Sequence, residues 1–184
     1  MPPPSTYAGF GRRLVAGLLD LAVIAAVTLS VGWIASHSKL SALVLLPPLW
    51  VAGMLYEPVL HAKFGATLGK FATGIRVVRA SGGSIGWQHS VIRSSVALAA
   101  SASWIYIVAP LAFALPPEDF HGQGWTEVFQ IIKGDFDAGY KIVELVLGIW
   151  FWSEFATMLM NSKHRAIHDF LAGTVVVNVK RSDA

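Results

Sequence analysis

The sequence predicts an all-α membrane protein, in which a four-helix transmembrane bundle carries a small cytoplasmic β element. Three observations favour this fold class. The chain is 54% hydrophobic and only 14% charged. Its apolar residues gather into runs of about 20 residues, the length that a helix needs to cross a bilayer. Its Lys and Arg residues flank these runs and form no continuous stripe, which disfavours nucleic acid as a partner. With 184 residues we expect one domain, 1–184, and no soluble enzyme beside the spans.

The first predicted span, residues 12–36, contains one carboxylate in an otherwise apolar run. Residues 14–34 include eleven Leu, Val and Ile residues, and Asp20 is their only charged residue. An acid at the centre of a helix costs roughly 3 kcal/mol to insert, whereas each aliphatic residue returns roughly 0.3–0.6 kcal/mol. The segment therefore inserts with Asp20 inside the membrane. Arg13, Gly17 and Asp20 share one helix face, and Gly17 leaves room there for a neighbouring backbone.

Three further spans are predicted at residues 41–61, 90–115 and 141–160. Each contains an ionisable side chain. Glu57 lies near the end of the second span and is expected to face the cytoplasmic water. Arg93 lies one turn inside the third span, where it can meet a carboxylate, and Asp20 is its predicted partner. Glu154 lies deeper, in the fourth span.

Two short β-rich stretches, residues 75–80 and 173–179, are predicted to pair as a small cytoplasmic cap. Either stretch alone would leave its backbone N–H and C=O groups without partners. Pairing would bring the end of the chain beside the loop that follows the second span. It would also hold Asp169 near the first helix.

The candidate functional residues are the charged side chains within or beside the spans. Intramembrane carboxylates are costly and usually face the bundle interior or a water-filled path. A nearby guanidinium favours the charged carboxylate and offers planar two-point contact. We predict that Arg13, Asp20 and Asp169 form one charged cluster at the cytoplasmic side of the bundle. The secondary candidates are Arg93, Glu154 and Glu57.

Residues 116–140 form a predicted outer loop that is acidic and aromatic. Trp125, Phe129, Ile132 and Phe136 recur at helical spacing, which fits a short amphipathic helix on the membrane surface. A contact with a partner protein has the same sequence pattern. Both interpretations of the loop stay open.

The sequence contains no fingerprint of catalysis. It has no Cys, and no nucleophile stands beside a general base. His164 and His168 are separated by four residues, but the HExxH arrangement of a zinc site is missing. We therefore expect no enzymatic activity, no metal and no cofactor.

Three stretches together resemble the RDD family of small membrane proteins. Residues 13–20, RLVAGLLD, match the family's Arg and its first Asp. Residues 65–86, GATLGKFATGIRVVRASGGSIG, resemble the segment T-P-G-K-x-x-x-G, with Leu68 where Pro is usual. Residues 164–177, HRAIHDFLAGTVVV, resemble the closing segment and supply the second Asp as Asp169. The resemblance leaves out the 116–140 loop, which is longer than in the common form of the family.

The resemblance implies one of two roles, because some RDD members are reported as cation/proton antiporters and others as accessory membrane proteins. On the first hypothesis, the chain couples transport of a cation or small solute to protons. Asp20 and Glu154 then exchange a proton for a cation, and four helices make so thin a wall that a homo-oligomer is required. On the second, the chain is a non-catalytic accessory or scaffold subunit that binds and stabilises a partner membrane protein.

The distribution of positive charge predicts that both termini lie in the cytoplasm, and the resemblance implies a bacterial cytoplasmic (inner) membrane. Ten Lys and Arg residues lie in the N-terminal, 62–88 and C-terminal stretches, and three lie in the other two loops. Cytoplasmic loops carry the excess of these residues.

Single cysteines test this topology, because the chain has no Cys of its own. Cysteines introduced at Ser38 and Gln123 should react with an impermeant thiol reagent outside intact cells. A cysteine at Ser182 should react only after the cells are opened. Labelling of position 182 in intact cells would contradict the predicted orientation.

Overall fold

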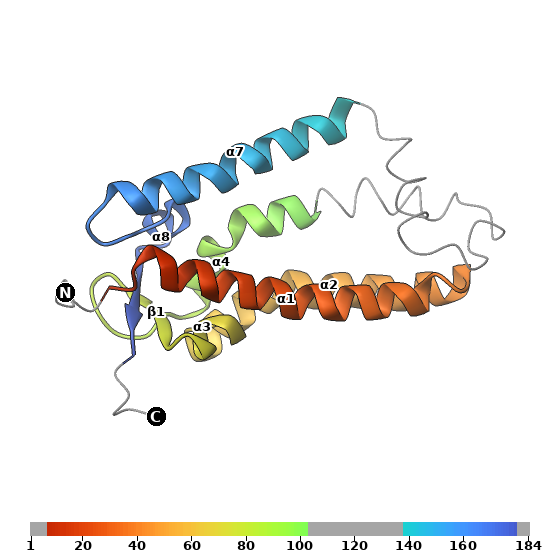
Figure 1. Ribbon diagram of the computed structural model, residues 1–184, viewed down its shortest axis with the longest axis horizontal. Helices are drawn as coiled ribbons and strands as arrows, with labels where there is room; N and C mark the ends of the chain where they lie inside the picture. The colour runs from red at the N-terminus through yellow and green to blue at the C-terminus, as the bar shows by residue number, and fades with distance from the viewer. Residues whose placement is uncertain (1–6, 103–137, 180–184) are drawn as a thin grey trace. The chain divides into compact units, whose positions relative to one another are not determined.

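The computed structural model describes residues 7–102 and 138–179. Figure 1 shows the elements in chain order. They are α1 (Phe10–Ala35), α2 (Lys39–Phe64), α3 (Leu68–Ala72), β1 (Ile75–Arg79), α4 (Trp87–Arg93), α7 (Ala138–Met160), α8 (Ile167–Leu171) and β2 (Thr174–Asn178).

Three helices in the described part of the chain are long and apolar enough to cross a membrane. They are α1, α2 and the Lys141–Met160 portion of α7. They coincide with the predicted spans 12–36, 41–61 and 141–160, so the chain is a membrane protein with several apolar helices. Of the predicted span 90–115, the structure describes the end of α4, a turn at Ser94 and helix from 95 to 102. The rest of that span and residues 116–137 lie outside the described residues, and the four-helix bundle stays a prediction.

The chain divides into two compact units. One comprises Ile24–Met54 and Ala97–Leu147, and the other comprises Met1–Val23, Leu55–Val96 and Gly148–Ala184. In the first, a short turn joins α1 to α2. The Ser41 N–H donates to Ser38 Oγ at 3.0 Å, and the Ser38 N–H donates to Ser41 Oγ at 3.1 Å. This reciprocal capping satisfies amide groups at the start of α2 that have no partner within the helix.

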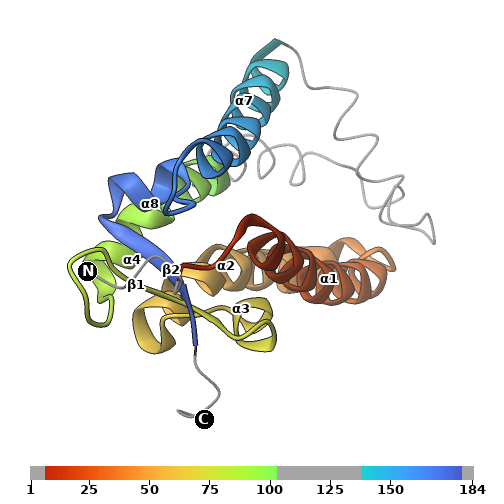
Figure 2. The same cartoon turned by 60° about the vertical axis from the view of Figure 1, so that its left-hand side comes forward.

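The second unit contains the small sheet and all six candidate residues. Strands β1 and β2 lie side by side (Figure 2) and pair antiparallel, which confirms the predicted pairing of 75–80 with 173–179. In this register Val77 lies opposite Val176. Tyr7 forms an isolated bridge with Val177, so the segment before α1 also lies along β2. One side of the sheet is buried in a core that consists of Ala8, Ala16, Ile75, Val77, Ile85 and Val176. The sheet therefore ties the start of α1 to the end of the chain.

Helix α3 lies against α1 at a contact that only glycine permits. Gly69, in the first turn of α3, is buried. A Cβ atom at Gly69 would overlap the carbonyl oxygen of Ala16 and would lie 2.9 Å from Asp20 Cγ. The close approach of a neighbouring backbone was predicted at Gly17, but no other described segment of the chain has an atom within 4 Å of the position that a Cβ would occupy there. The backbone instead approaches one residue earlier on α1, at Ala16.

Shortening Val77 should destabilise the sheet and its core. Its side chain is fully buried, so Val77→Ala should lower the free energy of unfolding by about 2 kcal/mol through lost apolar contact and a cavity. Val179 is 41% exposed, and Val179→Ala is the matched control that should cost little. Thermal unfolding of both variants in detergent measures the difference. Equal losses would show that the Val77 side of the sheet is not a core.

Candidate functional site

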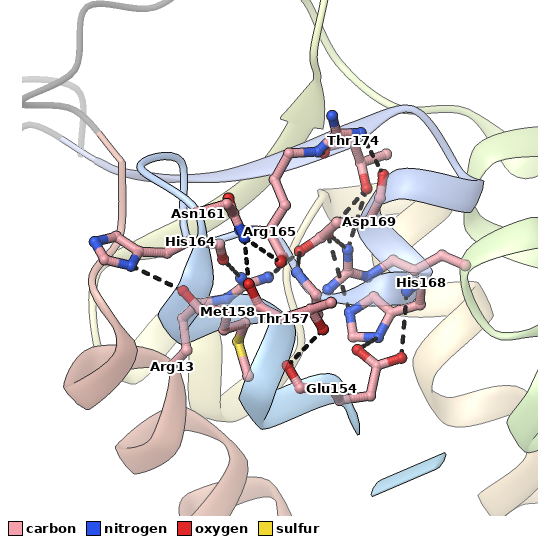
Figure 3. Close-up of polar contacts among 12 residues, drawn as sticks. Arg13, Glu154, Thr157, Met158, Asn161, His164, Arg165, His168, Asp169 and Thr174 are labelled. Atoms are coloured by element: carbon pink, nitrogen blue, oxygen red, sulfur yellow. Dashed lines mark hydrogen bonds and ion pairs between the residues drawn. The ribbon is translucent and has the colours of Figure 1, made fainter. Parts of the chain in front are cut away.

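Asp169 is the most completely buried carboxylate in the described part of the chain. It lies on α8 with none of its side chain exposed, and each carboxylate oxygen meets a guanidinium from a different helix. Arg13 of α1 donates from Nη2 to Oδ2, and Arg93 of α4 donates from Nη1 to Oδ1. Figure 3 shows this carboxylate at the centre of the polar contacts. We call Asp169, Arg13, Arg93 and Thr174 the Asp169 cluster.

Uncharged donors complete the Asp169 cluster. The Thr174 hydroxyl donates to Oδ1 at 3.0 Å, and the Ala166 N–H donates to Oδ2 at 3.1 Å. Arg93 Nη1 also donates to Thr174 Oγ1 at 3.1 Å. Burial by itself would raise the pKa of the Asp169 carboxyl, but Arg93 and Arg13 outweigh it and hold that pKa well below its usual range. Asp169 is therefore ionised at any physiological pH.

The guanidinium groups of Arg13 and Arg165 also bind the backbone around the Asp169 cluster. Arg13 Nη1 donates to the backbone carbonyl of His164, so this one guanidinium holds both the loop before α8 and α8 itself. Arg165 donates from Nη2 to the carbonyl of Asp169 at 2.8 Å and from Nε to that of Thr174 at 3.0 Å. The turn between α8 and β2 is thus fastened at several points.

Glu154 of α7 pairs with His168 beside the Asp169 cluster. Glu154 Oε2 lies 2.7 Å from His168 Nδ1, and the His168 N–H donates to Oε1 at 3.2 Å. Burial and the positive charge of Arg93 lower the pKa of His168, despite the hydrogen bond to Glu154. His168 is therefore neutral at neutral pH. The pairing joins the end of α7 to the start of α8.

Asp20 lies apart from this cluster, with a different kind of partner. Tyr56 Oη donates to Oδ1 at 2.7 Å, the Gly69 N–H donates to Oδ1 at 2.7 Å, and the Thr67 hydroxyl donates to Oδ2 at 2.5 Å. Tyr56 Oη in turn accepts from the Leu68 N–H at 3.2 Å. The donors thus come from α2 and from the first turn of α3, whose amide groups have no partners within the helix.

The predicted single cluster of Arg13, Asp20 and Asp169 is therefore wrong in one member. Arg13 and Asp169 meet, but Asp20 is held by α2 and α3 instead. Arg93, which was predicted to pair with Asp20, pairs with Asp169. The reason is geometric. Helix α3 packs against α1 at Ala16 and Asp20, and Arg13 lies about two turns, roughly 10 Å, from Asp20 along the axis of α1.

Glu57, the third secondary candidate, lies near two side chains that sequence reasoning did not single out. Its Oε1 is 3.6 Å from His61 Nδ1 and 3.8 Å from Lys70 Nζ. The Glu57 side chain is 39% exposed, whereas the Lys70 side chain is only 14% exposed. Tyr56, Thr67 and Lys70 were missed as site residues. The available signal was the run Thr67 to Lys70, which places a hydroxyl, a small residue and a cation around one helix start.

Residues 7–173 match the sequence profile of the RDD family. The chain belongs to the RDD family. The match covers most of the chain and includes both carboxylates, Asp20 and Asp169, with their surroundings. Comparisons with curated proteins and with solved structures gave no match. The family identifies this RDD protein, and the geometry of its own site is the basis for its proposed function.

Neutralising Asp169 should unfold this RDD protein. Asp169→Asn leaves two buried guanidinium groups without a carboxylate, which should cost about 3–5 kcal/mol. The folded-state pKa of Asp169 is below the unfolded value, so its contribution is complete at neutral pH and decreases as pH falls below about 4. Thermal unfolding of both proteins between about pH 2 and pH 7 measures both effects. Arg12→Gln, which removes an exposed guanidinium next to Arg13 in sequence, is the control and should cost little. A stable Asp169→Asn variant would refute the structural role.

Proposed function

We propose that this RDD protein exchanges a small cation for protons across the membrane, and that Asp20 binds either ion. One observation supports the proposal: Asp20 is a carboxylate on an apolar helix, and the three donors that contact it are uncharged. Intramembrane carboxylates of this kind are typical of ion and proton pathways. Such a group can be neutralised either by a proton or by a cation.

The nature of the donors also favours reversible binding at Asp20. The hydroxyls of Tyr56 and Thr67 each have lone pairs as well as a proton, so they can turn and accept when the carboxyl carries its own proton. A guanidinium has donors only. Asp169, which faces Arg13 and Arg93, therefore has no such freedom. In this proposal Asp20 exchanges ions, and the Asp169 cluster maintains the fold.

The finer features of the proposal follow from the sequence. Four spans, with residues 90–115 as the third, would lie in a bacterial inner membrane with both termini in the cytoplasm. The chain would act without enzymatic chemistry. Because four helices make a thin wall, a homo-oligomer would complete the path. Glu154 is assigned to the pairing with His168 and is not assigned an exchange role.

The substitution Asp20→Asn tests the proposal directly. An Asn side chain keeps one acceptor oxygen for Tyr56 and Gly69, and its NH₂ group can donate to a reoriented Thr67 hydroxyl. The variant should therefore stay folded, with an unfolding temperature close to that of the wild type, but it cannot bind a proton or neutralise a cation. Sodium and potassium flux in vesicles that contain only this protein, with a pH-sensitive dye inside, should fall to background.

The matched control is Glu144→Gln, which removes the same charge from an exposed position on α7 and should leave the flux unchanged. A wild-type protein without flux of either cation, together with a stoichiometric companion on purification from native membranes, would favour the accessory-subunit role. An unfolded Asp20→Asn variant would assign Asp20 to structure.

A further inference from the structure

A continuous set of polar side chains leads from Asp20 to the exposed Glu57. Lys70 Nζ lies 3.4 Å from Thr67 Oγ1, to which it donates. The Thr67 hydroxyl donates in turn to Asp20 Oδ2 at 2.5 Å. Both hydrogen bonds run in the same direction, from the ammonium through the hydroxyl to the carboxylate. This is the order that proton transfer through a hydroxyl requires.

We infer that Lys70 is the proton donor to Asp20 and that the Thr67 hydroxyl is the relay between them. The inference rests on the exchange function proposed for Asp20. In the step, one N–H proton of the Lys70 ammonium passes to Thr67 Oγ1 as the Thr67 hydroxyl proton passes to Asp20 Oδ2. Thr67 ends as a hydroxyl, Lys70 as a neutral amine and Asp20 as a neutral acid. One positive and one negative charge disappear together, so charge is conserved.

The surroundings of Lys70 favour this step. Burial lowers the pKa of the Lys70 amine, and Glu57 opposes the shift without cancelling it. An amine with a lowered pKa gives up its proton more readily. The charged and titratable groups that face Lys70 are Glu57 and His61 of α2, Asp20 and Arg13 of α1, and Arg93 of α4. The cations Arg13 and Arg93 also favour the neutral amine.

Glu57 provides the route by which Lys70 regains a proton. Its Oε1 lies 3.8 Å from Lys70 Nζ, and its side chain is 39% exposed. In the predicted topology this end of α2 lies at the cytoplasmic water, so that a proton can reach Lys70 through Glu57. The direction of flow reverses when a cation at Asp20 replaces the proton: Asp20 returns its proton through Thr67 to the neutral Lys70 amine.

Matched substitutions at Thr67 and Lys70 separate a relay from a structural role. Thr67→Val keeps the shape of this buried residue but removes the hydroxyl, whereas Thr67→Ser keeps it. Lys70→Arg keeps the positive charge and its donors, but a guanidinium does not release its proton in proteins. Proton-coupled sodium uptake should fall roughly 100-fold in Thr67→Val and Lys70→Arg. Thr67→Ser should keep most of the wild-type rate.

A second flux measurement shows whether Asp20 itself still binds the cation. Sodium–sodium exchange at equal pH on both sides needs no proton, so it should continue in Thr67→Val and Lys70→Arg. Loss of both exchange and coupled uptake would show that these residues only position Asp20 or maintain the fold, and would overturn the relay. Full coupled uptake in Lys70→Arg would overturn it equally.

The titration of Lys70 tests the relay without any flux. NMR of isotopically labelled lysine side chains, with Lys70 assigned through Lys70→Arg, should give Lys70 a pKa below the usual value of a lysine. Asp20→Asn should lower it further, because the carboxylate that favours the ammonium is gone. An ordinary Lys70 pKa, or one that is indifferent to Asp20→Asn, overturns the relay alone. Absence of wild-type flux overturns the proposed function instead, and with it the use of the relay in transport.

Discussion

The unit that contains the candidate residues depends on one buried carboxylate shared by two guanidinium groups. Asp169 has no exposed surface, and removing an ion from water is tolerable only when its charge and its lone pairs are matched. Arg13 and Arg93 match the charge, and Thr174 and the Ala166 N–H occupy the remaining positions on the carboxylate. The cluster therefore forms only when α1, α4 and α8 come together. A complete Asp169 cluster therefore requires the native arrangement of these three helices.

The second negative charge near this cluster belongs to Glu154. Two guanidinium groups around one carboxylate leave an excess of positive charge in a poorly hydrated place, and Glu154 lies close enough to Arg13 to attract it. Because His168 is neutral, the Glu154 carboxylate offsets the charge of the second of these guanidinium groups. The pairing of Glu154 with His168 thus has an electrostatic reason beyond its own hydrogen bond.

The sequence predicted the structure correctly where the groups of a segment had only one available partner or environment. Residues 75–80 and 173–179 both needed backbone partners, and they pair. The apolar runs needed a membrane, and three of them are the long helices α1, α2 and α7. The partner of Asp20 was not predictable in the same way. A carboxylate accepts equally well from a guanidinium, a hydroxyl or an amide, and the choice depends on where a helix of five residues lies. Helical periodicity carries no information about that placement.

Gly69 determines that choice. The glycine lets the backbone of α3 touch Ala16, and this contact brings the Gly69 N–H and the Thr67 hydroxyl within hydrogen-bond distance of Asp20. Any side chain at this position would push α3 away, and Asp20 would lose these donors together. The sequence alone favoured Gly17 for close packing, because it lies between two charges on one helix face. The structure shows that the small residue that matters is on the neighbouring segment, where it approaches the helix.

The two carboxylates of this RDD protein differ in what surrounds them, and the difference has a chemical consequence. The guanidinium groups around Asp169 have protons but no lone pairs, so they stabilise the ionised carboxylate and oppose its protonation. Two of the three donors on Asp20 are hydroxyls, which can donate to a carboxylate and accept from a carboxylic acid. The first arrangement fixes one charge state, whereas the second accommodates two. In the proposed exchange, the helix that carries Arg13 at one level and Asp20 two turns along is anchored at the first and exchanges ions at the second, because changes in charge at Asp20 do not require the Asp169 cluster to open.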